Sequence, residues 1–538
     1  MNRNTSARLF ASAKARIVAV TVVALLFAPP CCIGESAEEA TSDAQPEKTE
    51  VQLTLEECLR RTLQANLSLS AQALSIGIAQ QGVISAQAPF DSQLSLDLLY
   101  EKTRSQREDT RSDRRRADLS WSKRIRTGQV FRVTHNASRF NRDLEVPISP
   151  FYDLDWTFSA VQPLARGAGR TTNMAPVWIA RNQQQRSVLT TEEVVMNLLS
   201  VVEGAYLDLM FAVRFLDVQQ SGLKLAKELL AKHEEHVRIG KLPERSIEIQ
   251  QAKATIATRE EGVIIALNDI AKSEDSIRRL MNLPVRYEQD RPPLVPANEP
   301  LIDINIPTVG ESLSFTFAHR PQVRALKLDL DSAALELAAA RNNRLPNVDL
   351  RADVGFAGSN GNYGTAFDVL ADGRDYVWQV GLSVSYPWGN RAARSRYTQA
   401  RLNYERAKIL FNDFIEELRL EVINAHRNIQ TDIKRMASTK AAMEQAQLQL
   451  ELENELYAQE MSDSFRLLEF QDDLIAARIR HLAATIDFNR SYYNLLRVEG
   501  RGIRNEQFDL TDIAEKILRQ IPPYRPRSAL PKDRTLTG

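Results

Sequence analysis

The sequence contains one pattern of predicted elements twice, and this duplication limits the folds that the chain can adopt. Between Leu55 and Tyr100, a helical apolar period is followed by a break and an alternating strand, and Val309 to Val354 repeats this order at the same spacing. Three pairs of positions coincide in the overlay: Glu57 with Glu311, Leu94 with Val348, and Leu96 with Leu350. The chain is therefore predicted to be a duplicated unit rather than a series of unrelated domains.

Both halves continue in the same way. A strand closes at Gln162-Pro163-Leu164 in the first half and at Tyr386-Pro387-Trp388 in the second, and a long helical pattern follows each. We predict a first repeat over residues 53–283 and a second over 309–500. The linker between them, 284–308, is rich in proline and cannot be helical.

The predicted helices are unusually long. Arg170 to Arg238 and Ser395 to Glu460 are almost free of internal proline and glycine, so each would extend roughly 100 Å at about 1.5 Å per residue. Apolar residues keep coiled-coil spacing in both: Leu223, Ala226, Leu230, His233 and Val237, then Ile415, Leu418, Val422, Ala425 and Ile429. Shorter helices, each about half as long, are predicted at Thr54 to Ala88, Ser246 to Leu283, Glu311 to Arg344 and Phe465 to Val498. Stacked end to end in pairs, they would lie alongside the long helices.

Four segments alternate as β-strands: Gln93 to Glu101, Leu154 to Gln162, Asn347 to Phe356 and Tyr376 to Tyr386. Each has roughly the ten residues that a tilted membrane strand needs. Aromatic residues lie near the strand ends, where a membrane interface favours them. The strands alone leave a membrane sheet and a soluble antiparallel sheet equally open.

The first half contains an additional predicted hairpin, Asp118 to Arg126 and Gln129 to Ser138, around Thr127-Gly128. Its counterpart region in the second half, Gly355 to Arg374, is rich in Gly, Asn and Asp and is predicted to be an exposed loop. The basic run Arg111 to Arg116 is interpreted as a solvated loop. Because basic and acidic residues balance at 69 each, no net charge favours binding to nucleic acid.

The N-terminus has the features of an export signal. Basic residues precede the apolar run Ile17 to Phe27, which is too short to span a bilayer, so we predict a signal peptide over 1–32 and a disordered leader over 33–52. Cys31 or Cys32 is a candidate for lipidation, although Pro29 and Pro30 replace the small residues expected before an acylated cysteine. No later stretch is apolar enough to suggest a membrane helix. A barrel is the remaining way for an exported chain to span a membrane.

Together, the export signal, duplicated halves, two strands per half and rod-length helices resemble the TolC family of bacterial outer-membrane efflux proteins. The resemblance covers Leu53 to about Gly500, and its local signatures are the segments Gln162 to Arg170 and Gly240 to Glu244. It implies a mainly helical chain with membrane β-strands. Three copies would form a homotrimer with a 12-stranded barrel, four strands per chain, continued by a coiled-coil tunnel across the periplasm.

The resemblance also implies a function. The protein would be a passive, gated exit duct in the bacterial outer membrane, serving a tripartite efflux pump or a type I secretion system. Its partners would be a periplasmic adaptor and an inner-membrane transporter that supplies the energy. The alternative is a periplasmic coiled-coil adaptor or scaffold whose sheets are soluble, and an enzyme is a distant third.

The resemblance places a periplasmic gate near the tip of the second half. Tyr457 matches the family's gate tyrosine and Glu469 its pore-facing acidic residue, with Asp472 or Asp473 joining the carboxylates one turn later. Glu460 departs from the usual glycine, and Arg466 replaces a frequent acidic residue. An ordinary solvated helix position is the alternative for Glu469.

The helix tips are the predicted docking surface for the adaptor. The candidate residues are Ile239, Gly240, Lys241, Pro243, Glu460 and Met461. Gly240 permits a positive φ or close helix approach, and Pro243 would end one helix and begin the next. Both roles are also compatible with a purely structural turn.

No cofactor or metal chemistry is predicted. His233 and His236 lack the spacing of zinc-protease ligands, and His233 falls in a coiled-coil core position. Gly167-Ala168-Gly169 lacks the remaining glycine of a dinucleotide-binding loop. Cys58 inside a helix is interpreted as a small buried apolar residue, and no disulfide framework exists.

Overall fold

A computed structural model describes residues 51–105, 110–142, 151–240, 243, 246–284, 292–302 and 304–501. Several predicted segments lie outside these residues: the signal peptide with Cys31 and Cys32, nearly all of the leader, Lys241, and nearly all of the C-terminal tail, which we predict over 501–538. The first described element is a short strand, β1 (Val51–Leu53).

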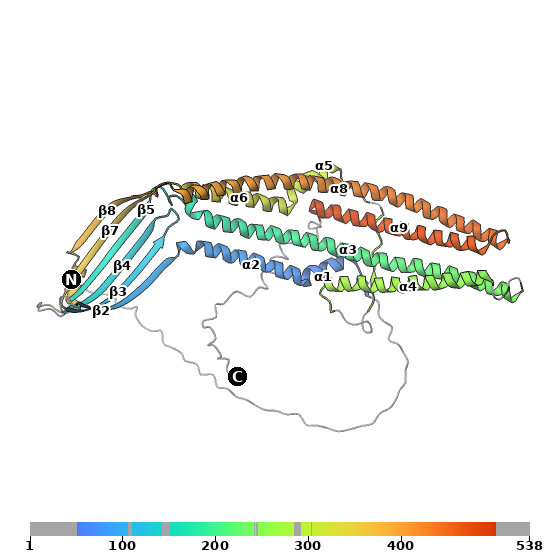
Figure 1. Cartoon of the computed structure of the whole chain (residues 1–538), viewed down its shortest axis with the longest axis horizontal. Coiled ribbons are helices and arrows are strands. Elements are labelled where there is room, and N and C mark those ends of the chain that lie inside the picture. Colours follow the sequence, from blue (N-terminus) through green and yellow to red (C-terminus); the bar gives the residue numbers. More distant parts are fainter. Residues whose placement is uncertain are drawn as a thin grey trace, which may run out of the picture. The chain divides into compact units, whose positions relative to one another are not determined.

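Two very long helices dominate the fold (Figure 1). Helices α3 (Arg170–Arg238) and α8 (Arg391–Ala458) contain 69 and 68 residues, which confirms the predicted rods of roughly 100 Å. Shorter helices pack along them: α1 (Leu55–Ala65), α2 (Leu67–Gln87), α4 (Ile247–Leu280), α5 (Val309–His319), α6 (Pro321–Asn342) and α9 (Ser464–Glu499). Six of the ten predicted coiled-coil positions are buried and four are partly buried. The buried positions are Ala226, His233, Leu418, Val422, Ala425 and Ile429, and the partly buried ones are Leu223, Leu230, Val237 and Ile415.

Two of the predicted half-length helices are each divided in two, at equivalent places in the repeats. Asn66 separates α1 from α2: its side-chain oxygen accepts from the N–H of Leu69 at 3.1 Å, and its amide donates to the carbonyl of Leu280 at 3.0 Å. Arg320 separates α5 from α6, because the residue before Pro321 is held in an extended conformation (ψ 119°). The apolar period alone predicts one continuous helix in each place. The side-chain cap of Asn66 interrupts the first helix, and Pro321 interrupts the second.

Among the described residues, one sheet of six strands contains the four predicted strands together with both strands of the additional hairpin. The strands are β2 (Ser92–Ser105), β3 (Thr110–Arg124), β4 (Val130–Arg142), β5 (Phe151–Pro163), β7 (Asn347–Asn360) and β8 (Tyr376–Ser385), in the order β2-β3-β4-β5-β7-β8. The additional hairpin supplies β3 and β4, which lie between β2 and β5 in one antiparallel sheet. The run Arg111 to Arg116 belongs to β3, so its interpretation as a loop is wrong.

The two faces of the sheet differ in polarity. One face carries mainly apolar side chains, at alternate positions along every strand. Examples are Leu96 on β2, Trp156 on β5 and Leu382 on β8, which the strand register places on the same side of the sheet. The other face carries mainly polar groups, and there the carboxylate of Asp353 accepts from Ser159 at 2.5 Å and from Gln379 at 2.9 Å. Exposed apolar side chains on β2 and β8 include Leu94, Leu96, Leu98, Trp378, Val380, Leu382 and Val384.

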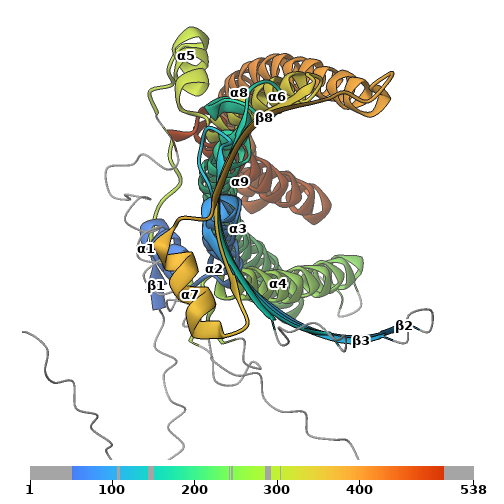
Figure 2. The ribbon, with the colours of Figure 1, turned by 90° about the vertical axis from the view of Figure 1, so that its left-hand side faces the viewer.

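The prediction of an exposed loop over Gly355 to Arg374 is wrong for most of its length, because the segment is mainly strand and helix. It contains the end of β7 and a ten-residue helix, α7 (Tyr363–Asp372), which packs on β7 and β5. Ala366 and Leu370 are buried against Leu154, on the apolar face. Figure 2 shows α7 on the convex side of the curved sheet. Gly358 permits this approach, because a Cβ there would lie 2.2 Å from the carbonyl oxygen of Ala366.

The linker between the repeats crosses the helices and contains one short strand. That strand, β6 (Leu294–Pro296), pairs in parallel with β1. Leu53, Leu294 and Ile277 share a hydrophobic cluster with Val202 of α3. The described part of the linker therefore belongs to the packed body, and none of its described residues is helical, as the prolines require.

Helix α3 is the one helix among the described residues that is long and apolar enough to cross a membrane. It contains an 18-residue window of mean hydropathy 1.5, and half of that window is buried inside the chain. The prediction that no stretch reaches this hydropathy is therefore wrong. Because Val202, Tyr206, Leu209 and Met210 of α3 pack against other helices, this apolarity is typical of a core helix.

Candidate functional site at the helix tips and the helical body

The turn between α8 and α9 follows a helix-ending hydrogen-bond pattern. The N–H of Met461 donates to the carbonyl of Leu456 at 2.9 Å, and that of Glu460 donates to Tyr457 at 3.1 Å. This pair of bonds requires a left-handed residue, and Glu460 indeed has φ 60°. Asp463 then begins α9 by accepting from the N–H of Arg466 at 2.8 Å. Glu460 thus occupies a conformation that glycine adopts at lower cost.

We expect Glu460→Gly to stabilise this turn by about 1 kcal/mol, because the left-handed conformation costs roughly 1–2 kcal/mol for a residue with a Cβ. Slower amide hydrogen exchange at Met461 would measure the effect. The matched control is Gln459→Gly, since Gln459 has an ordinary φ of −88° and gains nothing from glycine. Faster exchange in Glu460→Gly than in the unmodified protein would contradict the prediction.

The first tip, between α3 and α4, ends in the same way but with glycine. Gly240 has φ 75°, and its N–H donates to the carbonyl of Val237 at 2.9 Å. Ser246 begins α4 by accepting from the N–H of Ile249 at 3.4 Å, and its own N–H donates to Pro243 at 3.1 Å. Gly240 and Pro243 therefore have local turn roles, as the sequence allowed.

Both tips expose large apolar side chains. Ile239 and Ile247 at the first tip, and Met461 and Phe465 at the second, are each more than half exposed. Neither Ile247 nor Phe465 was among the candidate docking residues, although Ile247 directly follows the first predicted tip, Ile239 to Ser246, and Phe465 ends the second, Glu460 to Phe465. A turn normally exposes polar residues, so four apolar side chains there form a candidate contact surface.

Tyr457 contacts the neighbouring hairpin within the same chain. Its hydroxyl lies 3.5 Å from Nδ1 of His233, and the two rings pack edge to face at 6.4 Å. Burial raises the pKa of Tyr457, and nearby Glu248 raises it further. Burial also lowers the pKa of His233, with His236 adding to the effect and Glu248 opposing it. The contact joins α8 to α3 just above the tips.

Glu453 is a tip residue that sequence reasoning missed. It is only 4 % exposed, and its carboxylate accepts from the hydroxyl of Ser462 in the turn. A buried carboxylate with a turn hydroxyl as partner holds the turn against α8. The available signal was the position of Glu453 three residues after Leu450, on the buried side of the helix.

The three predicted acidic residues all lie on α9. Glu469, Asp472 and Asp473 are exposed, and Asp472 forms an ion pair with Arg259 of α4. Arg466, the residue expected to neutralise the group, is exposed and contributes its backbone N–H to Asp463. Within the described residues, no group of three His, Cys, Asp or Glu side chains could hold a metal ion.

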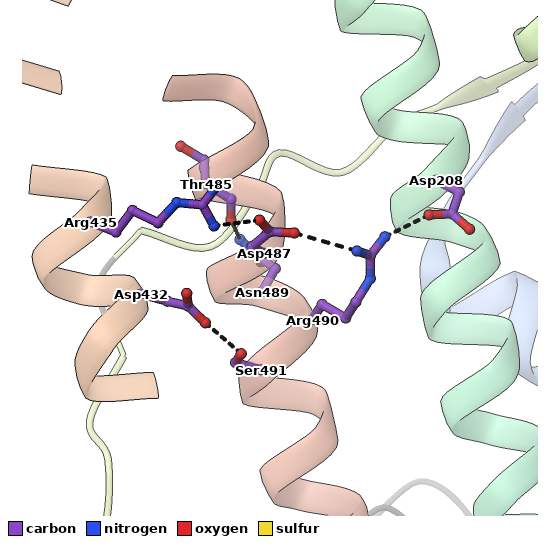
Figure 3. A network of polar contacts seen from close by, with 8 residues as sticks. All are labelled: Asp208, Asp432, Arg435, Thr485, Asp487, Asn489, Arg490 and Ser491. Atoms are coloured by element: carbon purple, nitrogen blue, oxygen red, sulfur yellow. Dashed lines mark hydrogen bonds and ion pairs between the residues drawn. The ribbon is translucent and has the colours of Figure 1, made fainter. Parts of the chain in front are cut away.

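A polar network joins α3, α8 and α9 in the helical body (Figure 3). Arg490 of α9 donates to Asp208 of α3 at 2.6 Å and lies 3.4 Å from Asp487, which in turn accepts from Arg435 of α8 at 2.7 Å. Ser491 donates to Asp432 of α8 at 2.6 Å. These contacts connect the paired helices α8 and α9 to the long helix of the other repeat.

Asn489 connects the same helix to the linker. Its amide donates to the carbonyl of Leu301 at 3.0 Å, and its side-chain oxygen accepts from the N–H of Leu301 at 2.9 Å. Asn489 is 1 % exposed, and its amide also donates to Thr485 at 2.8 Å. Ile304 and Ile306 of the linker pack beside it against α8 and α9.

Glu203 is an ionisable group of α3 whose side chain is partly buried in the helical body. Burial raises its pKa from 4.5 to about 8. Burial raises the pKa of Tyr493 to about 12, and the nearby carboxylate of Glu203 adds to this shift. The sequence did not identify Glu203, because its residue type and position do not distinguish it from the other charged residues of the long helix.

The glycine loop before α3 has its polar groups satisfied by the protein. The N–H of Gly167 donates to Asn342 at 2.8 Å, and Asn173 donates to the carbonyls of Gly167 and Gly169, both at 2.8 Å. These contacts fix the loop that connects the sheet to α3.

Comparison with known proteins identifies one family model, described as outer membrane efflux protein, which matches residues 313–501. Among curated proteins, none matches the sequence at a significant level. Solved structures match over most of the chain. The outer-membrane channel OprN is 16% identical, covers 83% of this chain and 89% of its own, and has a TM-score of 0.65.

Two further structures give similar values. The MtrE outer membrane channel of Neisseria gonorrhoeae, solved in its open state, is 18% identical over 83% of this chain and 88% of its own, with a TM-score of 0.60. The CmeC outer membrane channel of Campylobacter jejuni is 14% identical over 91% and 97%, with a TM-score of 0.61. At these identities the likeness shows the fold.

Proposed function

Because this chain belongs to the outer membrane efflux protein (TolC) family, we propose that it is the outer-membrane exit channel of a tripartite efflux system. It conducts cargo passively from the periplasm to the exterior and catalyses no reaction. The observation that carries this function is a six-stranded sheet with one apolar and one polar face, joined directly to helices of roughly 100 Å. Channels of this family are homotrimers.

The apolar face of the sheet supports membrane insertion over the soluble scaffold. Leu98, Trp378 and Leu382 on this face are each more than 60 % exposed in the single chain. A soluble periplasmic sheet would leave this surface in water, whereas lipid covers it without cost. Tyr363 and Phe367 of α7, both about half exposed, add aromatic side chains near the far end of the strands, as an interface favours.

The gate lies at the periplasmic tips in this proposal. In a trimer, three copies of Glu469 with Asp472 and Asp473 narrow the entrance and favour cations. The ion pair between Asp472 and Arg259 offsets part of the negative charge at the entrance. Glu469 and Asp473 therefore supply most of the negative potential that attracts cations. The contact between Tyr457 and His233 holds α8 against α3 in the closed arrangement.

The adaptor docks at the tips through an interleaved helical hairpin. Ile239, Ile247, Met461 and Phe465 provide apolar contacts, and Gly240 and Glu460 shape the two turns. Docking separates α8 from α3, widens the entrance, and connects the duct to an inner-membrane transporter that supplies the energy. A type I secretion system would use the same surfaces.

We expect Glu469→Ala to weaken block of the channel by Mg²⁺ about tenfold, a loss of about 1.4 kcal/mol of attraction. Single-channel recording in planar bilayers measures the block from the periplasmic side. Glu405→Ala, an exposed glutamate on α8 far from the turn, is the matched control and should leave block unchanged. Equal block in both variants would place the gate elsewhere along the tunnel.

The function itself is tested by extracting the protein from outer membranes in mild detergent and imaging the particles. A threefold hollow rod with detergent at one end, which conducts ions after reconstitution, is the expected result. Water-soluble particles that bind no detergent would instead identify a periplasmic scaffold.

A further inference from the structure

We infer that the outward edges of β2 and β8 bind those of further copies of this chain, closing three sheets into one 18-stranded barrel. This inference rests on the proposed channel function, and it departs from the twelve strands that the family resemblance implied. Each chain contributes six strands, because the hairpin β3–β4 forms part of the membrane wall. The alternative places β3 and β4 outside a 12-stranded wall as an accessory flap.

The hydrogen-bond ladder is the first observation against a flap. β2 pairs with β3 along its whole length, from Ser92 opposite Lys123 to Ser105 opposite Thr110. Among the described residues, β2 has no other strand partner, and β5 pairs with β4 and β7. A 12-stranded wall would require β2 to leave β3 and pair with β5, which would break two complete ladders.

The distribution of side chains is the second observation. The pairing places Leu119 and Trp121 of β3 beside Leu96 and Leu94 of β2, on the apolar face. Phe131 and Val133 of β4 lie opposite Ala160 and Phe158 of β5, on the same face. In a membrane wall, every strand must place its apolar side chains on the same face as its neighbours do. A flap in water is under no such constraint.

The polar face of the hairpin is equally continuous with the rest of the wall. Ser95 of β2 and Ser120 of β3 share a hydrogen bond of 2.7 Å, and Asn136 of β4 donates to Asp155 of β5 at 2.6 Å. Arg116 and Asp118 of β3 form an ion pair at 2.7 Å on this side. These polar contacts suit a water-filled lumen and would be costly against lipid.

The strand directions permit closure with identical copies. β2 follows α2 and runs away from the helices, whereas β8 runs back towards them and is followed by α8. The β8 edge of one copy and the β2 edge of the next are therefore antiparallel, like every other neighbour in the sheet. An open edge in lipid leaves backbone groups unsatisfied at several kcal/mol each, so closure is required in the membrane.

The consequence is a wider outer end. Barrel diameter grows roughly in proportion to strand number, so 18 strands give about 1.5 times the width of 12, in the range where porins hold an aqueous channel. The outer end of the channel is then too wide to select cargo. The periplasmic entrance is instead the part that restricts which cargo passes.

The test compares the unmodified trimer with a variant lacking Thr110–Arg142, both reconstituted in lipid and imaged by cryo-electron microscopy. The deletion leaves β2 and β5 antiparallel, and the register brings Leu98 level with Leu154 on the apolar face. We expect 18 strands in the unmodified trimer and 12 in the variant, with the outer bore narrower by about one third. Exclusion of polyethylene glycols added from the exterior gives an independent measure of that bore.

A matched control replaces α7, Tyr363–Asp372, with a flexible linker of equal length, which alters the sheet surface without removing a strand. It should keep 18 strands and the original bore. An unmodified trimer with 12 strands and a detached hairpin would overturn the inference and leave the channel function intact. Particles that neither insert in lipid nor conduct would overturn the channel function instead. The strand count of the unmodified protein decides the question even if the deletion variant does not fold.

Discussion

Glu203→Gln is expected to have the same stability as the unmodified protein near pH 4.5 and to become the more stable of the two as pH rises. The folded-state pKa of Glu203 is about 8 against 4.5 for the free side chain, so the folded chain keeps a proton that the unfolded chain releases. Stability from this group is therefore complete below pH 4.5 and is lost as pH rises to 8. Glutamine, which does not titrate, avoids that loss.

Between the two pKa values, the expected difference grows by about 1.4 kcal/mol for each pH unit, and it reaches about 4 kcal/mol at pH 8. Unfolding of the purified trimer, followed by far-ultraviolet circular dichroism at several pH values, measures it. Glu228→Gln on the exposed face of the same helix controls for the amide substitution itself. A difference that stays constant from pH 5 to 8 would show that a charge in the assembled protein neutralises Glu203.

Asn489→Ala is expected to destabilise the helical body by about 3 kcal/mol, because it leaves both backbone groups of Leu301 without their side-chain partner. Asn489 is buried, so water does not replace the amide directly. The linker would detach from α9 before the helices separate. Amide exchange at Leu301 should therefore accelerate much more than exchange in α3.

Asn424→Ala is the matched control for this substitution. Asn424 is an exposed asparagine on α8 whose side-chain oxygen accepts from the guanidinium of Arg427 at 3.3 Å, and its loss should cost well under 1 kcal/mol. Equal effects of the two substitutions, or unchanged exchange at Leu301, would show that the linker does not depend on Asn489.

The helices could be predicted closely from the sequence, and the tip chemistry only in part. The turn positions of Gly240 and Glu460 follow from local rules, because a helix end needs a left-handed residue at a fixed place. The ion pair between Asp472 and Arg259 could not be predicted, since the two residues are far apart in the chain and meet only when α4 packs near α9. The functional roles of the gate and docking residues stay predictions.

The sheet shows the same division. Alternation along β7 and β8 was visible in the sequence, and so was the hairpin around Gly128. What the sequence did not reveal is that this hairpin lies between β2 and β5, because alternation assigns a residue to a face but not a strand to a neighbour. For this reason the sequence predicted four wall strands and a separate hairpin, whereas the structure places all six strands in one sheet.

By itself the sequence determined the repeated order of elements, the length of the helices and the polarity of the strand faces, because each depends on periodicity within one short segment. Tertiary structure alone decided the strand order, the burial of Glu203 and Glu453, and the contact of Tyr457 with His233. These depend on the register between segments that are distant in the chain, and only packing of the whole body fixes that register.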